Sequence, residues 1–293
     1  MRYGRFAAVA GVVVLVAASA LAGRPIDEKK AASPTGTVEI SNVAGSVRVT
    51  GWDRAEIAVK GTLGEGAERL DFSVTGDHAL IKVVLPRNAH NAEPSHLEIS
   101  LPAGSRVEGK TVSADITVAT VAGKLELESV SGDIVVEAAS KEVDARTVSG
   151  SIKVAAPAAV RAKSVSGAVN LKGPVGEVRV ASVSGVVTIA GGSFTDATVE
   201  TTSGSIQVDG DLAKDGRLEA KSVSGSVELA LPATVAAGFE VSTLSGTIEN
   251  EFGAQARRTS EYGPGHELEF TNAGGGARIR VRTFSGSVTL RKR

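Results

Sequence analysis

The chain has 293 residues, a formal net charge of −1 and 22% charged residues, which disfavours both a disordered polyelectrolyte and a strongly basic nucleic-acid-binding protein. Cysteine is absent, and this excludes disulfides, thiol catalysis, zinc–thiolate sites and iron–sulfur clusters. Aromatic residues make up only 3%, whereas glycine occurs 34 times, so the core has to be built from Val, Ile, Leu and Ala.

Residues 1–22 have the pattern of a secretory signal peptide. Arg2 and Arg5 precede an apolar stretch that ends in Ala20-Leu21-Ala22, the small-x-small pattern that signal peptidases cleave. We expect cleavage after Ala22 and an exported chain; the alternative is an uncleaved membrane anchor, although about 17 apolar residues are few for a span. Residues 23–36 are polar and contain two prolines, which predicts a flexible N-terminal segment.

The body of the chain, residues 108–250, repeats the phrase apolar-Ser-Gly-x-apolar-x-apolar. Successive copies lie 17 to 21 residues apart, so the repeating unit has about 18 residues. We predict that Ser-Gly forms a bend in each unit, because glycine accepts a positive φ without steric cost. The predicted bend glycines are Gly132, Gly150, Gly167, Gly185, Gly204, Gly225, Gly246 and Gly286.

Each repeat carries two alternating apolar–polar stretches, which indicate two strands with one buried face each. The fold class predicted is therefore all-β: a parallel β-solenoid of two-strand coils of about 18 residues. A β-meander or sandwich is the alternative. It would need hairpin signals between the strands, and Asp209-Gly210 and Asp215-Gly216 occur only in one irregular unit.

The regions on either side of the repeats differ from them. Residues 37–107 alternate without the short period and contain Trp52, which predicts an N-terminal β cap over the strand edges. Residues 251–293 contain an irregular insertion and two closing strands. The terminal Arg291-Lys292-Arg293 is expected to place charges at the last edge and so to discourage end-to-end growth.

Several phrases resemble a bacterial putative-adhesin family. They are Gly51-Trp52-Asp53 after a Gly-Ser-Val-Arg-Val strand, Leu97–Pro102 before the repeats, the recurrent Val-Ser-Gly-x-Ile-x-Val and the closing Ser-Gly-Ser-Val-Thr-Leu. The resemblance covers roughly residues 37–290. It implies a β-solenoid-like fold, a location in the cell envelope and no known cofactor. The family is a domain of unknown function, so the resemblance assigns no catalytic residues.

One row of basic residues is a candidate interaction site. Arg146, Lys163, Lys221 and Arg282 stand at near-equivalent positions before the Ser-Gly bends, and stacked coils would align them into a stripe. Such a stripe would suit anionic glycopolymers or lipid head groups. An ordinary charged surface, balanced by Glu126, Glu137 and Glu219, is the simpler interpretation.

Candidate catalytic and metal-binding groups are few. Asp115 and Asp133 share a phase of the repeat and are the best candidates for an acid pair of a polysaccharide-active enzyme. His90, His96 and Glu93 could bind zinc, but their spacing is loose. Calcium-binding repeats need a recurrent Asp beside paired glycines, and this chain has Ser before each glycine. We expect no enzymatic activity, no metal and no cofactor.

Every recurring position is assigned here to folding and none to chemistry. The sequence therefore favours a non-catalytic, exported structural or interaction protein of the cell envelope, periplasmic or on the surface. Its partner would be an unidentified envelope component, whether protein, glycan or lipid, bound by a sheet face or by the irregular loops 86–96 and 251–276. The alternatives are the polysaccharide-active enzyme and a stress sensor that binds anionic lipid or peptide.

Overall fold

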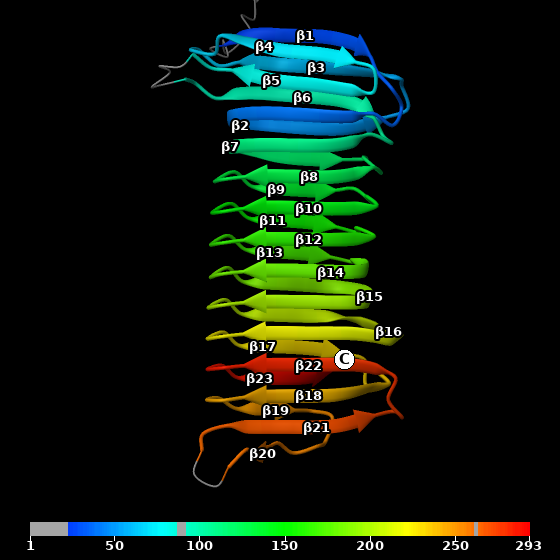
Figure 1. Ribbon diagram of the computed structural model, residues 1–293, viewed down its shortest axis with the longest axis vertical. Coiled ribbons are helices and arrows are strands. Elements are labelled where there is room, and N and C mark those ends of the chain that lie inside the picture. The colour runs from blue at the N-terminus through cyan, green and yellow to red at the C-terminus, as the bar shows by residue number, and fades with distance from the viewer. Residues whose placement is uncertain (1–22, 87–91, 261–262) are drawn as a thin grey trace, which may run out of the picture.

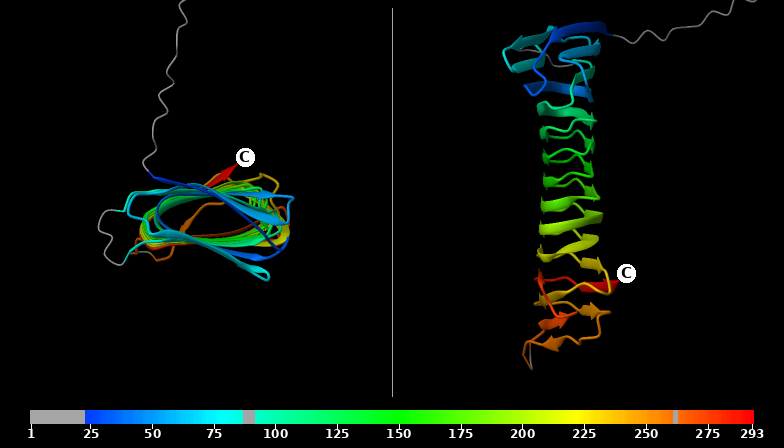
Figure 2. Two further views of the ribbon diagram at one scale, coloured as in Figure 1. Left: turned by 90° about the horizontal axis from the view of Figure 1, so that it is seen from above. Right: turned by 90° about the vertical axis from the view of Figure 1, so that its right-hand side faces the viewer.

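The computed structural model describes residues 23–86, 92–260 and 263–293, and all regular elements of these ranges are β-strands. The strands stack along one axis into a straight rod (Figure 1), which is a flattened oval when seen along that axis (Figure 2). The all-β prediction is thus confirmed. The signal sequence and His90 lie outside the described residues.

Two sheet faces form the body of the rod. Face 1 contains β8 (Lys124–Ser129), β10 (Glu142–Thr147), β12 (Ala159–Ser164), β14 (Val175–Ser182) and the second halves of β15 (Val187–Thr201) and β16 (Ile206–Ser222). Face 2 contains β9 (Ile134–Glu137), β11 (Ile152–Ala155), β13 (Val169–Lys172) and the first halves of β15 and β16. Each coil contributes one strand to each face.

Neighbouring coils pair in parallel with equivalent residues in register. Leu125 is opposite Val143, Val143 is opposite Val160, and Val160 is opposite Val178. The inward positions form columns of Val, Ile, Leu and Ala between the two faces. A larger residue needs special room: the buried ring of Phe194 lies where a Cβ on Gly210 would stand. This explains the low aromatic content as a consequence of narrow layers.

A column of buried hydroxyl groups lines the Ser-Gly bends, and at Gly132, Gly150, Gly185, Gly204 and Gly225 the hydroxyl binds the bend backbone. The residue three places before each bend glycine is Ser or Thr, and its side chain points inward. The hydroxyl oxygen accepts the glycine N–H, at 2.9 Å from Ser129 to Gly132, 3.0 Å from Thr147 to Gly150 and 2.7 Å from Ser222 to Gly225. The hydroxyl thus satisfies a backbone donor that the sharp bend removes from the strand ladder.

The bend glycines are required for a different reason from the one predicted. They have no positive φ, so left-handed backbone does not explain them. Instead, a Cβ on Gly150 would overlap with the carbonyl oxygen of Gly132, and a Cβ on Gly167 would overlap with that of Gly150. The same relation continues through Gly185, Gly204, Gly225, Gly286 and Gly246, each against the glycine of the adjacent coil. Close stacking of backbone on backbone excludes any side chain there.

Thr201 and Thr202 test the hydroxyl column within one bend. Thr201 is buried and its Oγ1 accepts the Gly204 N–H at 3.0 Å, whereas the side chain of Thr202 is exposed. We expect Thr201→Val to lower the free energy of unfolding by about 1–3 kcal/mol, because the buried N–H loses its acceptor. Thr202→Val should change it by less than about 0.5 kcal/mol. Urea unfolding of both variants measures the difference, and equal midpoints would contradict the assigned role.

The N-terminal end is not built in chain order. β2 (Thr37–Trp52) forms a coil that pairs in parallel with β7 (Arg106–Ala119) on one side and with β5 (His78–Val84) and β6 (Ser95–Pro102) on the other. Antiparallel strands then cover the end: β4 (Arg69–Thr75) on β5, β3 (Glu56–Leu63) on β6, and β1 (Arg24–Ala31) on β3.

The C-terminal end repeats this inversion. The last coil, β22 (Ala277–Thr283) and β23 (Val288–Lys292), pairs with β16 and β17 (Val227–Leu231) on one side and with β18 (Ala237–Thr243) and β19 (Ile248–Asn250) on the other. Antiparallel β21 (His266–Asn272) and β20 (Arg257–Arg258) follow at the end of the rod. The C-terminus therefore lies inside the stack (Figure 1), and the prediction that Arg291-Lys292-Arg293 guards the last edge is wrong.

Candidate functional site

The predicted basic residues share one outward column of face 1 but form no continuous stripe. In stacking order the column contains Lys110, Glu128, Arg146, Lys163, Ala181, Glu200, Lys221, Arg282 and Ser242. Arg146 binds Glu128 at 2.7 Å, and Lys221 binds Glu200 at 3.0 Å. Ala181 and Glu200 thus separate Arg146 and Lys163 from Lys221 and Arg282, and ion pairs partly neutralise Arg146 and Lys221, which weakens the case for an anionic partner.

Two further columns of face 1 form a ladder of ion pairs along the rod. Glu126 accepts from Arg106 at 2.8 Å and from Lys124 at 3.1 Å, and Lys124 also reaches Glu142 at 3.3 Å. Arg161 continues the ladder from Glu142 toward Glu177. A hydrogen bond from Lys124, together with the charge of Arg106, lowers the pKa of Glu126 below its ordinary value of 4.5.

The ladder predicts a contribution to stability that acid removes. Because the folded pKa of Glu126 is lowered, its contribution is fully present above pH 4.5 and is lost as the pH falls through the folded pKa. Glu126→Gln should therefore lower the free energy of unfolding at pH 7 by less than about 1 kcal/mol, and this deficit should shrink as the pH falls toward 2. Glu249→Gln is the control, since Glu249 has no ion-pair partner among the described residues. A deficit of the Glu126 variant that persists unchanged at pH 2 would contradict this origin.

The edge of the rod that carries the Ser-Gly bends displays a row of exposed apolar side chains. Each lies two places before the glycine of its bend, or before Ala114 in one coil, and the nine apolar members are 37–58% exposed. We call this row the valine ridge; in stacking order it contains Val43, Val112, Val130, Val148, Val165, Val183, Thr202, Val223, Phe284 and Leu244. Backbone bonds from each bend Ser N–H to the carbonyl of the ridge residue one coil away keep the order fixed, for example 2.9 Å from Ser149 to Val130.

The valine ridge corrects the view that folding explains every recurring position. Its side chains point away from the core, so burial does not account for a repeated apolar residue there. The sequence did contain the signal: inward positions at Val143, Ala145 and Thr147 put Val148 on the outward side by simple alternation. The repeated phrase shows only that this residue is apolar, and the alternation of its neighbours shows that it points outward.

The residues that follow the bend glycines flank the ridge on face 2. In stacking order they are Asp115, Asp133, Ser151, Ala168, Val186, Ser205, Ser226, Ser287 and Thr247. Val186 is 45% exposed and lies in the same bend as Val183. With Ala181 on the face 1 side, the central coil of this edge is its most apolar one, and Lys163 and Glu200 lie in the two adjacent coils on face 1.

The carboxylates of the candidate acid pair, Asp115 and Asp133, accept hydrogen bonds from backbone N–H groups of the next coil. The Oδ1 atom of Asp115 accepts the N–H of Asp133 at 2.8 Å, and the Oδ1 atom of Asp133 accepts the N–H of Ser151 at 2.8 Å. The two carboxylates thus continue the stacking of the coils at a place where neighbouring coils have Ser or Ala. This arrangement favours a structural role for both residues over acid–base catalysis.

The candidate zinc ligands are not gathered by the described part of the chain. The Nδ1 atom of His96 lies 2.9 Å from the Oγ atom of Ser46. Within residues 23–86, 92–260 and 263–293 no group of three or more His, Asp or Glu side chains could hold a metal ion.

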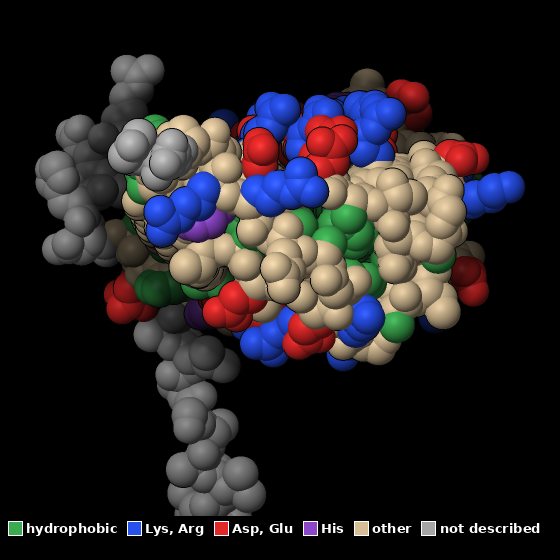
Figure 3. Space-filling model, turned by 90° about the horizontal axis from the view of Figure 1, so that it is seen from below, with side chains coloured by type: hydrophobic (Ala, Val, Ile, Leu, Met, Phe, Trp, Pro, Cys, Tyr) green, Lys and Arg blue, Asp and Glu red, His purple; other side chains and the backbone are tan. Residues whose placement is uncertain are grey.

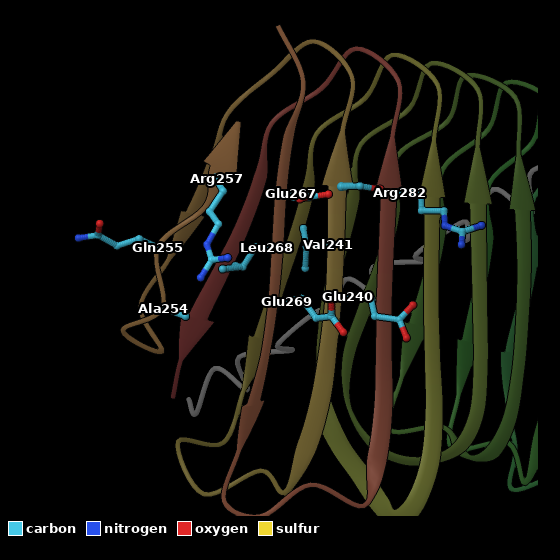
Figure 4. A pocket seen from close by; sticks show the side chains of 10 residues that line it. Glu240, Val241, Ala254, Gln255, Arg257, Glu267, Leu268, Glu269 and Arg282 are labelled. Carbon is cyan, nitrogen blue, oxygen red and sulfur yellow. The ribbon is translucent and has the colours of Figure 1, made fainter. Parts of the chain in front are cut away.

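The predicted binding loop at the C-terminal end borders an open cleft of about 750 Å³. Ala254, Gln255 and Arg257 line one side, and the outward side chains of Glu240, Glu269 and Arg282 come from the sheet (Figure 4). Viewed from below, charged side chains of both signs lie along the two long sides of this end (Figure 3). The cleft is polar and open, with no group buried in it that would select one ligand.

The aromatic residues near this cleft pack against one another and do not form a ligand-binding surface. Phe239 is buried, its ring stacks on Phe270 at 4.4 Å between centroids, and Phe252 lies 5.3 Å from Phe239. The three rings close the last layer of the core where the coils end, so they act as a plug.

One protein family matches almost the whole chain. The chain matches the family described as Toastrack DUF4097 over residues 35–175 and again over residues 173–291. No curated protein matches it. Within the described residues, no helix is long and apolar enough to cross a membrane.

Solved structures from Bacteroidetes are similar along nearly the whole chain. A putative adhesin from Parabacteroides merdae has 10% identity, covers 92% of this chain and 97% of its own, and gives a TM-score of 0.47. A putative adhesin from Bacteroides fragilis has 12% identity, covers 91% and 97%, and gives 0.45. A putative lipid binding protein from Parabacteroides distasonis has 13% identity, covers 92% and 98%, and gives 0.43.

The two family matches together span the stacked coils and both ends of the rod, and they confirm the resemblance carried by the Val-Ser-Gly phrases. The chain belongs to the Toastrack DUF4097 family.

Proposed function

We propose that the protein is an exported, non-catalytic interaction protein of the cell envelope. Its coils of about 18 residues form a rigid parallel solenoid with antiparallel ends, and the valine ridge is its binding surface. The observation that carries this proposal is the exposure of the ridge: nine of its ten members are apolar and 37–58% exposed, although the core does not need them.

The adhesin-like description of the structural neighbours agrees with an interaction role, and the signal-peptide pattern of residues 1–22 supports export. N-terminal sequencing of the protein recovered from the envelope should give Gly23 as the first residue. If the first residue is Met1, the segment is not cleaved, and the protein would be anchored in the membrane rather than released.

Binding to envelope preparations tests the ridge. The immobilised protein should retain envelope vesicles of the producing cell, and Val148→Asp with Val223→Asp should lower retention at least about tenfold, because two charges interrupt an apolar contact. Val175→Asp is the control: Val175 is 57% exposed on the opposite edge of the rod. Equal retention by all three proteins would exclude the ridge as the binding surface.

A further inference from the structure

We infer that the occupant of the valine ridge is a second copy of this chain, bound edge to edge and antiparallel, with the two-fold axis beside Val183. This inference rests on the proposed function, since it names the partner of the same surface. It also has consequences of its own that purified protein can show.

The ridge has the size and composition of a dimer interface. Nine consecutive coils, from Val112 to Leu244, spaced about 4.8 Å apart give a strip about 40 Å long. With its flanking columns the strip offers on the order of 600–800 Å² per copy, close to the roughly 800 Å² per partner of a standard interface. Its central coil, with Ala181, Val183 and Val186, is apolar, and charged residues of face 1 begin in the two adjacent coils with Lys163 and Glu200.

The regular spacing selects the partner. Any ligand that covers the whole ridge must offer a contact at each coil, and a second copy does so by construction. A two-fold axis at Val183 places this residue against itself. It also places Val165 opposite Thr202, Val148 opposite Val223, Val130 opposite Phe284, and Val112 opposite Leu244. Of these five distinct pairings only Val165 with Thr202 is not between two apolar side chains, and Val43, one coil beyond Val112, has no counterpart in the ridge.

The flanking column of face 1 is complementary to itself in this arrangement. The axis brings Ala181 to its own copy, Lys163 opposite Glu200, and Glu128 opposite Arg282. Arg146 and Lys221 are the one like-charged pair, and each already binds two acidic side chains of its own chain: Glu128 and Asp144 for Arg146, Glu200 and Glu219 for Lys221. Opposite charges thus fix the register, and the like charges are already neutralised.

The flanking column of face 2 adds no repulsion. The same axis pairs Val186 with itself, Ala168 with Ser205, and Asp133 with Ser287. A parallel dimer would instead put face 1 beside face 2 coil by coil, and Glu128 would then lie next to Asp133 of the other copy. The antiparallel dimer avoids that contact between two acids.

Sedimentation of the purified full chain tests self-association. We expect a concentration-dependent dimer, and Val183→Asp should weaken it at least about a hundredfold, because the axis brings the two introduced carboxylates together in the apolar centre. Val183 is 46% exposed in the single chain, so the fold tolerates the change. Val175→Asp, on the opposite edge, should dimerise like the wild type. A wild-type chain that stays monomeric at all concentrations overturns the inference, as does a Val183→Asp dimer of unchanged affinity.

Single cysteines test the direction, since the chain contains no other cysteine. Under mild oxidation Val183→Cys should form a disulfide-linked dimer, because the axis places this residue against itself. Val112→Cys alone should not, whereas Val112→Cys combined with Leu244→Cys should. Equal cross-linking of the single variants at positions 183 and 112 would show a parallel dimer and overturn the antiparallel arrangement.

The two proposals can fail separately. A monomeric protein that still retains envelope vesicles through the ridge would contradict the self-association alone. A dimer with no ridge-dependent retention would contradict the ridge as a binding surface for envelope vesicles, while the second copy would remain its occupant.

Discussion

Gly167→Ala is expected to lower the free energy of unfolding by about 3 kcal/mol or more, although it adds a single methyl group. An added Cβ would overlap with the carbonyl oxygen of Gly150 in the adjacent coil, and that oxygen belongs to main chain that neighbouring coils hold on both sides. The coils would have to separate locally, which would weaken the backbone hydrogen bonds of the bends. Urea unfolding followed by circular dichroism measures the loss.

Two further glycines separate stacking from backbone conformation. Gly173 has a φ of 59° and open space around its Cβ position, so Gly173→Ala should cost only about 1–2 kcal/mol for the left-handed backbone. Gly238 has open space and no positive φ, so Gly238→Ala should be neutral or slightly stabilising. Lys163→Ala, a surface change, should fall within about 0.5 kcal/mol. A smaller loss for Gly167→Ala than for Gly173→Ala would refute the stacking explanation.

Phe239→Ala is expected to cost about 3–5 kcal/mol, the range for removing a fully buried aromatic side chain. Phe239 is 1% exposed, and its ring contacts both Phe270 and Phe252, so its removal opens the plug of the last core layer. The loss should be concentrated at the C-terminal end, because each coil is stabilised mainly by its neighbours. Hydrogen exchange should therefore speed up most in β18, β19 and β21.

Phe284→Ala is the matched control, since Phe284 is 58% exposed on the valine ridge. Its truncation should leave the stability of the single chain within about 0.5 kcal/mol. Comparable losses for the two phenylalanine variants would mean that Phe239 does not have the structural role assigned to it.

Most of the fold could be predicted from the alternation of apolar and polar residues and from the repeated phrase. The inward phase of Val143 and Ala145 and the repeated Ser-Gly predict strands, bends and aliphatic columns, because short-range sterics and burial decide these features. The reason for the glycines was not accessible, since the overlap at Gly167 arises from a coil that lies 17 residues away in the chain. The recurrent Ser or Thr at positions such as Thr147 is present in the sequence, but the pattern does not show that this hydroxyl binds the bend N–H.

The order of coils at the two ends could not be predicted. Phe284-Ser285-Gly286 has the same phrase as the other bends, and nothing local shows that its coil lies between those of Ser224 and Ser245. The predicted basic stripe is interrupted for a related reason: Arg146 and Lys221 lie in one column as predicted, but Glu200 lies between them and Glu128 pairs with Arg146, and both acids belong to other coils. Contacts between coils decide both features, and the sequence shows only contacts along the chain.

The inserted last coil changes how the rod would respond to tension. A force applied at the C-terminus acts first on β23, which is bonded on both sides, to β17 and to β19, so its parallel ladders must shear together rather than open one bond at a time. A force applied at the N-terminus acts first on β1, an edge strand bonded to β3. The rod is thus expected to yield at its N-terminal end first, and an attachment through the C-terminal end would withstand the greater load.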